Sequence, residues 1–166
     1  KSASIEEIDA IFGQALGRPK SAVFQTADLV GLDLLVAVAE HCYHGLPKDP
    51  ERDLYKPPAW LVEMVKNGQL GRKGDGGFYK KAEKTEANPK GLVAWNWKDK
   101  SYAPVAKVRI DSLGVAKNTD DLAKRMKAVV FANDRAGEIA WPVLRDTLAY
   151  AMRCLGELAD DVASID

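Results

Sequence analysis

Glycines and cations gather in one stretch of the chain, Gly68–Lys81, where binding chemistry is most expected. Five glycines fall within ten residues there, a density that disfavours helix and permits positive φ and close approach of the backbone. Arg72 and Lys73 stand among them. Bare backbone N–H groups and cationic side chains that point at one spot suit an anionic ligand. The alternative is a tight surface turn feeding an edge strand, and composition alone favours that plainer interpretation.

No other constellation of residues amounts to a complete site. The glycine stretch lacks the Gly-Lys-Ser/Thr of a Walker loop, and it follows a predicted helix where a Rossmann fingerprint would follow a strand. His41 and His44 flank Cys42 and could present two imidazoles to zinc, but no third or fourth ligand lies nearby in the sequence. No Ser–His–Asp set can be recognised. We therefore predict neither a metal site nor a catalytic residue.

Charge is unevenly distributed along the 166 residues, although the net charge is zero. Residues 66–107 carry ten Lys and Arg against four Asp and Glu, and both flanking segments are acidic. A solvated loop region would give the same pattern. No aromatic–basic interleaving accompanies the charge, so nucleic acid is not an expected partner. No apolar run reaches the ~18 residues of a transmembrane helix, and two distant cysteines predict reduced thiols and a cytoplasmic protein.

The elements expected before the glycine turn are helices. Ser4 and Glu7 form a capping box, and the apolar periodicity predicts a helix from there to about Leu16. The run from Leu32 to Tyr43 is apolar on most of its circumference, which predicts a helix in the middle of a bundle. Two shorter helices are expected at 24–30, broken near Gly31, and from Pro57 to about Lys66.

Beyond the turn the pattern changes from helical to strand-like and then back. Segments 92–97 and 101–105 predict a β-hairpin, with Pro104 indicating an edge strand. Helices resume with an N-cap expected at Asn118 or Thr119. The last long helix should start near Asp134, and an apolar stripe predicts that it packs along a partner helix: Trp141, Leu144, Leu148, Ala151 and Leu155.

Three segments together resemble the C-terminal helical domain of 3-hydroxyacyl-CoA dehydrogenase. They are Leu16-Gly-Arg-Pro-Lys-Ser-Ala, Thr26-Ala-Asp-Leu-Val-Gly-Leu-Asp, and the stretch from Met64 through Gly-Gln-Leu-Gly-Arg-Lys to Gly-Gly-Phe-Tyr-Lys-Lys. Their order and separations match that family over residues 4–81. The resemblance implies an all-α fold, mainly a helical bundle like the C-terminal domain of 6-phosphogluconate dehydrogenase, with the β-hairpin as a small insertion.

The resemblance also implies a domain organisation. Residues 1–81 correspond to the helical domain without its first helix, residues 82–107 to a linker and β-hairpin, and residues 108–166 to the start of a second, degenerate copy. An internal echo fits this division, because Ser4–Asp9 and Asp160–Asp166 are both acidic segments that end in Ile-Asp. We accordingly expect the chain to be cut from a larger dehydrogenase polypeptide.

The activity implied is NAD-dependent oxidation of (S)-3-hydroxyacyl-CoA to 3-oxoacyl-CoA in fatty-acid β-oxidation. In the family a His base and the NAD site lie on a Rossmann domain, so NAD would be held mainly outside this chain. His41 and His44 do not match that His. Lys73 matches the lysine that reaches the cofactor across the cleft, and it is the one predicted cofactor-binding residue.

The expected partners are the acyl-CoA substrate, the Rossmann domain of the same polypeptide and a possible second subunit. The chain would supply one cleft wall and a dimerisation surface, and by itself it should be inactive. Two alternatives remain open: a non-catalytic oligomerisation or docking module of a fused β-oxidation enzyme, and another dehydrogenase that shares the helical-domain architecture.

Overall fold

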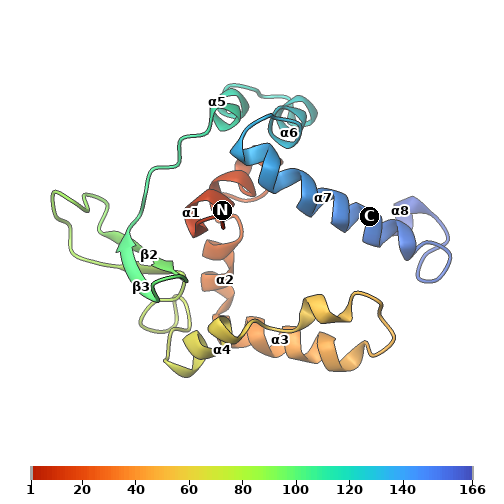
Figure 1. The fold of residues 1–166 in the computed structure, drawn as a ribbon, viewed down its shortest axis with the longest axis horizontal. Coiled ribbons are helices and arrows are strands. Elements are labelled where there is room, and N and C mark those ends of the chain that lie inside the picture. Colours follow the sequence, from red (N-terminus) through yellow and green to blue (C-terminus); the bar gives the residue numbers. More distant parts are fainter. Residues whose placement is uncertain (1, 166) are drawn as a thin grey trace. The chain divides into compact units, whose positions relative to one another are not determined.

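The computed structural model describes residues 2–165 and divides the chain into two compact units (Figure 1). Among the described residues, unit 1 holds those up to Gly13 together with Pro19–Val108, and unit 2 holds Gln14–Arg18 together with those from Arg109 onward. A short N-terminal segment thus belongs to the C-terminal unit. No described helix is long and apolar enough to cross a membrane.

Helices predominate in both units, which confirms the all-α prediction with a small β insertion. The elements of unit 1 are α1 Ile5–Ile11, α2 Phe24–Val30, α3 Leu32–Gly45, η2 Arg52–Tyr55, α4 Ala59–Lys66, β1 Tyr79–Lys81, β2 Leu92–Asn96 and β3 Ser101–Pro104. The elements of unit 2 are η1 Gln14–Leu16, α5 Asp111–Lys117, α6 Leu122–Val130, α7 Arg135–Arg153 and α8 Val162–Ile165.

The first helix is capped as predicted but ends early. The Ser4 hydroxyl accepts from the Glu7 N–H, and the Glu7 carboxylate accepts from the Ser4 N–H, which completes the capping box. The helix stops at Ile11, so its predicted extension to about Leu16 was wrong. The next residues form η1, which packs on α5 and α6 of unit 2, and the Leu122 side chain lies against Gly17. Tertiary packing therefore overrides the apolar periodicity.

Gly31 separates α2 from α3, as expected, with a φ of 104° that L side chains rarely adopt. The predicted burial of α3 in the middle of a bundle is wrong within the described residues. Leu32 and Val36 are buried, but Leu34 and Val38 are 50% and 52% exposed. Unit 1 covers only one face of this helix and leaves its other apolar face open.

The core of unit 1 brings the helices and the glycine turn together. Its buried members are Ile5, Leu32, Val36, Leu61, Met64 and Phe78. The Phe78 ring follows directly on the glycine turn and meets Phe24 edge to face at 4.5 Å between centroids. Trp60 and Trp97 also pack against this cluster. The turn is thus fixed to the core through its last aromatic residue.

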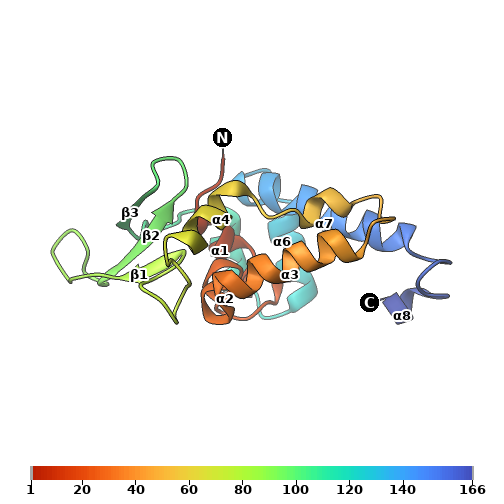
Figure 2. The same cartoon turned by 90° about the horizontal axis from the view of Figure 1, so that it is seen from below.

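The predicted hairpin is present and gains a third strand (Figure 2). β2 and β3 pair antiparallel with Trp95 opposite Tyr102, whose rings lie 5.1 Å apart. β1 pairs antiparallel on the other side of β2, so the order is β1-β2-β3 and Pro104 lies on an edge strand as expected. The strand that ends the glycine turn is therefore part of the sheet.

In unit 2 the N-cap prediction at Asn118 or Thr119 was wrong. Asp121 caps α6, because its carboxylate accepts from the Lys124 N–H. Asn118 and Thr119 instead follow α5, a seven-residue helix that the sequence pattern did not predict. With an exposed Gly114 in its interior and few apolar residues, α5 carries a weak helical signal.

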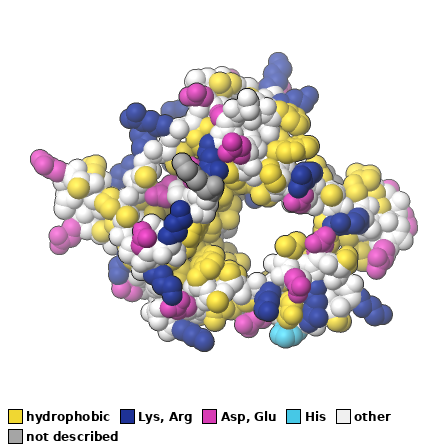
Figure 3. All heavy atoms as spheres, in the orientation of Figure 1, with side chains coloured by type: hydrophobic (Ala, Val, Ile, Leu, Met, Phe, Trp, Pro, Cys, Tyr) yellow, Lys and Arg dark blue, Asp and Glu magenta, His cyan; other side chains and the backbone are white. Residues whose placement is uncertain are grey.

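The long helix α7 begins as predicted after Asp134, whose carboxylate accepts from the N–H groups of Ala136 and Gly137. Beyond this first turn its apolar stripe is only partly covered by described residues. Trp141 is 44% exposed and Leu148 is 64% exposed. Figure 3 shows hydrophobic side chains at the surface around the end of α7 and α8. Asp166, the last residue of the acidic echo, lies outside the described residues.

Candidate functional site

The glycine turn closes on itself through its backbone. Gly71 and Gly76 form an isolated antiparallel bridge in which the Gly71 N–H donates to the Gly76 carbonyl at 2.9 Å. Their φ values are 84° and 98°, in the left-handed region that only glycine adopts readily. The glycines are therefore required by the shape of the turn, whatever it binds.

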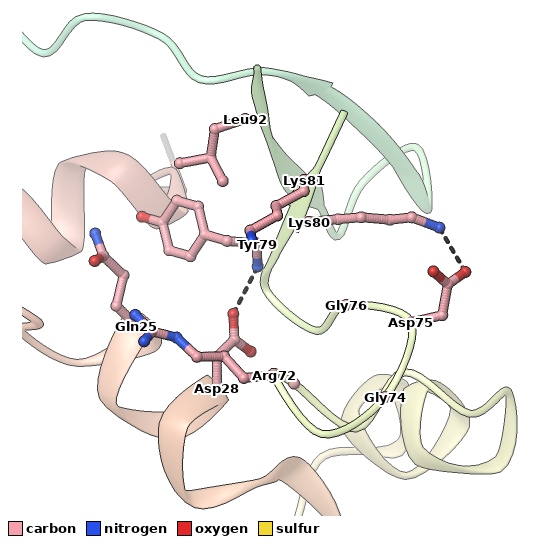
Figure 4. A pocket seen from close by; sticks show the side chains of 11 residues that line it. Gln25, Asp28, Arg72, Gly74, Asp75, Gly76, Tyr79, Lys80, Lys81 and Leu92 are labelled. Carbon is pink, nitrogen blue, oxygen red and sulfur yellow. Dashed lines mark hydrogen bonds and ion pairs between the residues drawn. The ribbon is translucent and has the colours of Figure 1, made fainter. Parts of the chain in front are cut away.

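The turn is folded around one buried carboxylate, Asp28 of α2. One oxygen accepts from the Phe78 N–H and the other from the Tyr79 N–H, both at 2.8 Å. Figure 4 shows the second of these bonds. The Arg72 N–H donates to the Asp28 carbonyl at 2.8 Å. A Cβ at Gly71 would collide with the Asp28 backbone, and one at Gly77 would collide with its carboxylate. The turn and α2 thus fit only without side chains at these two glycines.

Burial sets the electrostatics of this clamp. Asp28 is 3% exposed, and burial raises its pKa above the ordinary value of 3.8, although the N–H groups of Phe78 and Tyr79 lower it. Sequence reasoning noticed Asp28 only as part of a family motif and did not predict this role. The available signal was an acidic residue on an otherwise apolar helix face, 50 residues from a glycine turn.

A second carboxylate, Asp9 of α1, fixes the other end of α2. It accepts from the N–H groups of Val23 and Phe24 at 3.0 Å and 2.7 Å, and from the Tyr79 hydroxyl at 2.9 Å. Burial, with Asp9 as a further cause, raises the pKa of Tyr79 far above its ordinary value. Tyr79 is therefore a neutral donor that connects the turn to α1.

Lys73, the predicted cofactor ligand, lies on the outer side of the turn. Its ammonium forms an ion pair with Asp33 of α3 at 2.5 Å, and the side chains are 47% and 42% exposed. The hydrogen bond from Lys73 lowers the pKa of Asp33. The stem of Lys73 crosses Gly31, where a Cβ would displace it. An ammonium has three donors, so Lys73 retains hydrogen-bonding capacity beside Asp33 and fits a contact with ribose hydroxyls or a diphosphate.

A cavity of about 640 Å³ opens on the inner side of the turn. It is lined by Gln25, Asp28, Gly71, Arg72, Gly74, Asp75, Gly76, Tyr79, Lys80, Lys81 and Leu92. Lys73 and Asp33 are not part of this lining. The structure therefore places the cations of the glycine stretch on two sides, Lys73 outside and the other three around the cavity.

The histidines do not join a site. His41 and His44 are exposed on α3, and the part of the chain that the structure describes contains no group of three or more His, Cys, Asp or Glu placed to hold a metal.

Comparison with known proteins finds a family match and several relatives of this chain. Residues 1–81 match the family of the 3-hydroxyacyl-CoA dehydrogenase C-terminal domain. A Bacillus subtilis protein named a probable 3-hydroxyacyl-CoA dehydrogenase is 37% identical over 164 residues, which cover 98% of this chain and 20% of that protein. A Mycobacterium tuberculosis protein named a 3-hydroxybutyryl-CoA dehydrogenase is 38% identical over 77 residues, or 46% of this chain and 25% of that protein.

A third relative is named as a trifunctional enzyme. A Rickettsia prowazekii protein that carries the name of a fatty acid oxidation complex trifunctional enzyme is 35% identical over 104 residues, which cover 62% of this chain and 14% of that protein. The chain thus spans a quarter or less of the length of these relatives. No solved structure matches the chain.

Proposed function

We propose that the chain belongs, through residues 1–81, to the family of the 3-hydroxyacyl-CoA dehydrogenase C-terminal domain, and that it is the C-terminal portion of such an enzyme. The intact protein would oxidise (S)-3-hydroxyacyl-CoA with NAD in fatty-acid β-oxidation, in the cytoplasm. The observation that carries this proposal is the family match, together with similarity to the Bacillus subtilis protein along 98% of the chain.

Within that enzyme, unit 1 would supply one wall of the cofactor cleft and Lys73 would be its contact with NAD. NAD supplies the hydride acceptor when it is bound. The support from this chain is an ammonium half exposed on a rigid turn, because Phe78 fixes the turn to the core and Asp28 clamps its backbone. Asp33 holds the Lys73 side chain in place and leaves donors free for the cofactor. We assign no catalytic residue to this chain.

Residues 108–166 would begin a second, degenerate copy of the helical domain, after a linker and hairpin at 82–107. The open apolar stripe on α7 supports this division, since a helix of this kind requires a covering partner. The same stripe favours the second candidate function, a non-catalytic oligomerisation or docking module. In the cleft role Lys73 contacts NAD, whereas in the module role it has no contact with the cofactor.

The test uses the intact polypeptide and the Lys73→Ala variant. Loss of a cofactor contact should raise the KM for NAD about tenfold and leave the KM for 3-hydroxybutyryl-CoA unchanged. Asp33→Ala is the matched control, because it breaks the same ion pair from the other side and leaves the ammonium in place. It should raise the KM for NAD much less than Lys73→Ala does.

Two results would contradict the cleft role. If Lys73→Ala leaves the KM for NAD unchanged, the module interpretation is favoured. If both variants raise it equally, the ion pair acts on the turn and Lys73 does not touch the cofactor. An intact protein without dehydrogenase activity on any 3-hydroxyacyl-CoA would contradict the proposed function itself, and so would full activity of the isolated 166-residue chain.

A further inference from the structure

We propose that the cavity inside the glycine turn is a second anion site, which takes a phosphate or diphosphate group between Arg72 and Lys81. This site is separate from the Lys73 contact. Arg72 and Lys73 are adjacent in sequence, but Arg72 lines the cavity, whereas Lys73 pairs with Asp33 outside it. The family assignment made no use of the cavity.

The cavity lining carries three cations, Arg72, Lys80 and Lys81, against two carboxylates. Of the two carboxylates in the lining, Asp75 pairs with Lys80 at 2.6 Å. Asp28 already accepts from two backbone N–H groups and is buried. Among the described residues, neither the Arg72 guanidinium nor the Lys81 ammonium has a hydrogen bond or an ion pair. Charge-assisted hydrogen bonds to phosphate oxygens are the interactions such groups form most strongly.

The side chains divide between the two sides of the cavity. Figure 4 shows Arg72 extending from the turn toward Gln25, while Lys80 extends the other way to Asp75. The anion should therefore bind on the side of Arg72, Gln25 and Tyr79, where Lys80 does not neutralise it. The Asp28 carboxylate also lines the cavity and interacts electrostatically with Arg72, but its two oxygens already accept from the N–H groups of Phe78 and Tyr79.

The backbone of the turn adds a donor to this lining. The Asp75 N–H has no hydrogen-bond acceptor among the described residues, whereas Gly76 pairs with Gly71 in the antiparallel bridge. Gly74 and Gly76 carry no side chain that would cover this backbone, and the stem of Lys80 lies where a Cβ of Gly76 would be. An unpaired N–H group of a glycine turn favours an anion. At about 640 Å³ the cavity has the volume of a small-molecule site, larger than a single phosphate requires.

The volume and the two separated sets of donors favour a phosphate that belongs to a larger molecule. NAD and coenzyme A are the nucleotide probes that the proposed function suggests, and both contain an adenosine-linked diphosphate. The choice of these two rests on the proposed function, whereas binding of a simple phosphate does not. Dephospho-coenzyme A keeps the diphosphate but lacks the 3′-phosphate of coenzyme A. It therefore shows which of these two groups the site binds.

The experiment titrates the isotopically labelled 166-residue chain with inorganic phosphate, pyrophosphate, NAD, coenzyme A and dephospho-coenzyme A, at constant ionic strength. We expect saturable shifts of the Asp75 amide and of the Arg72 side chain, with pyrophosphate binding at roughly 1 mM or tighter. The double variant Arg72→Gln/Lys81→Gln should weaken binding about tenfold or more.

Lys107→Ala is the matched control for general charge, because it removes an exposed lysine of unit 1 outside the cavity. It should not change pyrophosphate affinity more than about twofold. Lys73→Ala separates this site from the Lys73 contact, and in this variant the shifts of the Asp75 amide and the Arg72 side chain should persist. A loss in Lys107→Ala equal to that of the double variant would show non-specific screening, and disappearance of these shifts in Lys73→Ala would place the anion outside the cavity. Either result would overturn the proposal.

The wild-type titration decides the matter even if the double variant fails to fold. Absence of saturable shifts at Asp75 and Arg72 with pyrophosphate at about ten times the expected dissociation constant overturns the site. If pyrophosphate binds but neither NAD nor coenzyme A does, the anion site stands and the proposed nucleotides are wrong. Failure of the dehydrogenase assay described above would leave these titrations unaffected.

Discussion

Two phenylalanine rings, one in each unit, lie in opposite environments. In unit 1 a glycine turn, two helices and a sheet converge on Phe78, which is 1% exposed. In unit 2 the first turn of α7 is buried through Ala136 and Ala140, but Phe131, just before it, is 68% exposed. Both units contain well-capped helices. Capping and periodicity can therefore form a helix without providing a surface that covers it.

The largest expected difference between the units comes from one substitution made in each. Phe78→Ala removes a buried ring from the core of unit 1 and should lower its free energy of unfolding by about 3–5 kcal/mol. Phe131→Ala removes an exposed ring that contacts Trp141, and it should cost unit 2 about 1 kcal/mol or less. Denaturation followed by amide hydrogen exchange, which resolves the two units, measures both. Similar losses in both units would contradict the contrast.

Asp28→Ala tests whether the clamp stabilises unit 1. It leaves the N–H groups of Phe78 and Tyr79 buried without their acceptor, so unit 1 should lose about 3 kcal/mol. Asp134→Ala is the counterpart in unit 2, where loss of an N-cap should cost about 1 kcal/mol. Urea denaturation of each variant, followed by hydrogen exchange in its own unit, compares the two. A smaller loss for Asp28→Ala than for Asp134→Ala would refute the clamp.

Glycines should respond with opposite signs in the two units. Gly71→Ala forces a left-handed φ and a collision with Asp28, so it should destabilise unit 1 by about 2 kcal/mol or more. Gly114 lies exposed in α5 with open space around it, so Gly114→Ala should stabilise unit 2 by about 0.5–1 kcal/mol. Thermal and urea unfolding of the two variants are the measurement. Stabilisation by Gly71→Ala would show that the turn is not constrained.

The smallest expected difference is in how the stability of each unit depends on pH, where Asp28 and Asp134 should act with opposite signs. Burial raises the pKa of Asp28, so native unit 1 binds this proton more tightly than the unfolded chain does. The contribution of Asp28 to stability should therefore rise as the pH falls through its folded pKa toward the ordinary value of 3.8.

Asp134 should behave the other way. Burial raises its pKa, but the hydrogen bonds from Ser112, Gly137 and Ala136 outweigh burial and hold the pKa below 3.8. Its contribution is present above that value and is lost as the pH falls through the folded pKa. The measurement is the unfolding free energy of wild type, Asp28→Asn and Asp134→Asn between about pH 3 and 6. Subtracting each variant from wild type gives the pH-dependent contribution of that carboxyl group. Slopes of equal sign would contradict this assignment.

Local signals in the sequence determined the elements that depend on neighbouring residues. The Ser4–Glu7 capping box, the break at Gly31, the helix start near Asp134 and the hairpin of 92–97 and 101–105 all involve short-range or adjacent-strand interactions, and all are present in the structure. The glycine stretch was identified as the main feature for the same reason. Residue type and spacing suffice where the interaction spans a few residues.

Long-range contacts decided the rest. The helix after Ser4 ends at Ile11 because the residues of η1 pack in unit 2, and α3 leaves an apolar face open because unit 1 covers only the other. Likewise, only the folded turn separates Arg72 from Lys73. Asp33 of α3 pairs with Lys73 outside the cavity, whereas the Asp28 carbonyl of α2 accepts from the backbone N–H of Arg72, which lines the cavity. Two adjacent cations are equivalent in the sequence. Their neighbours in space give them different environments.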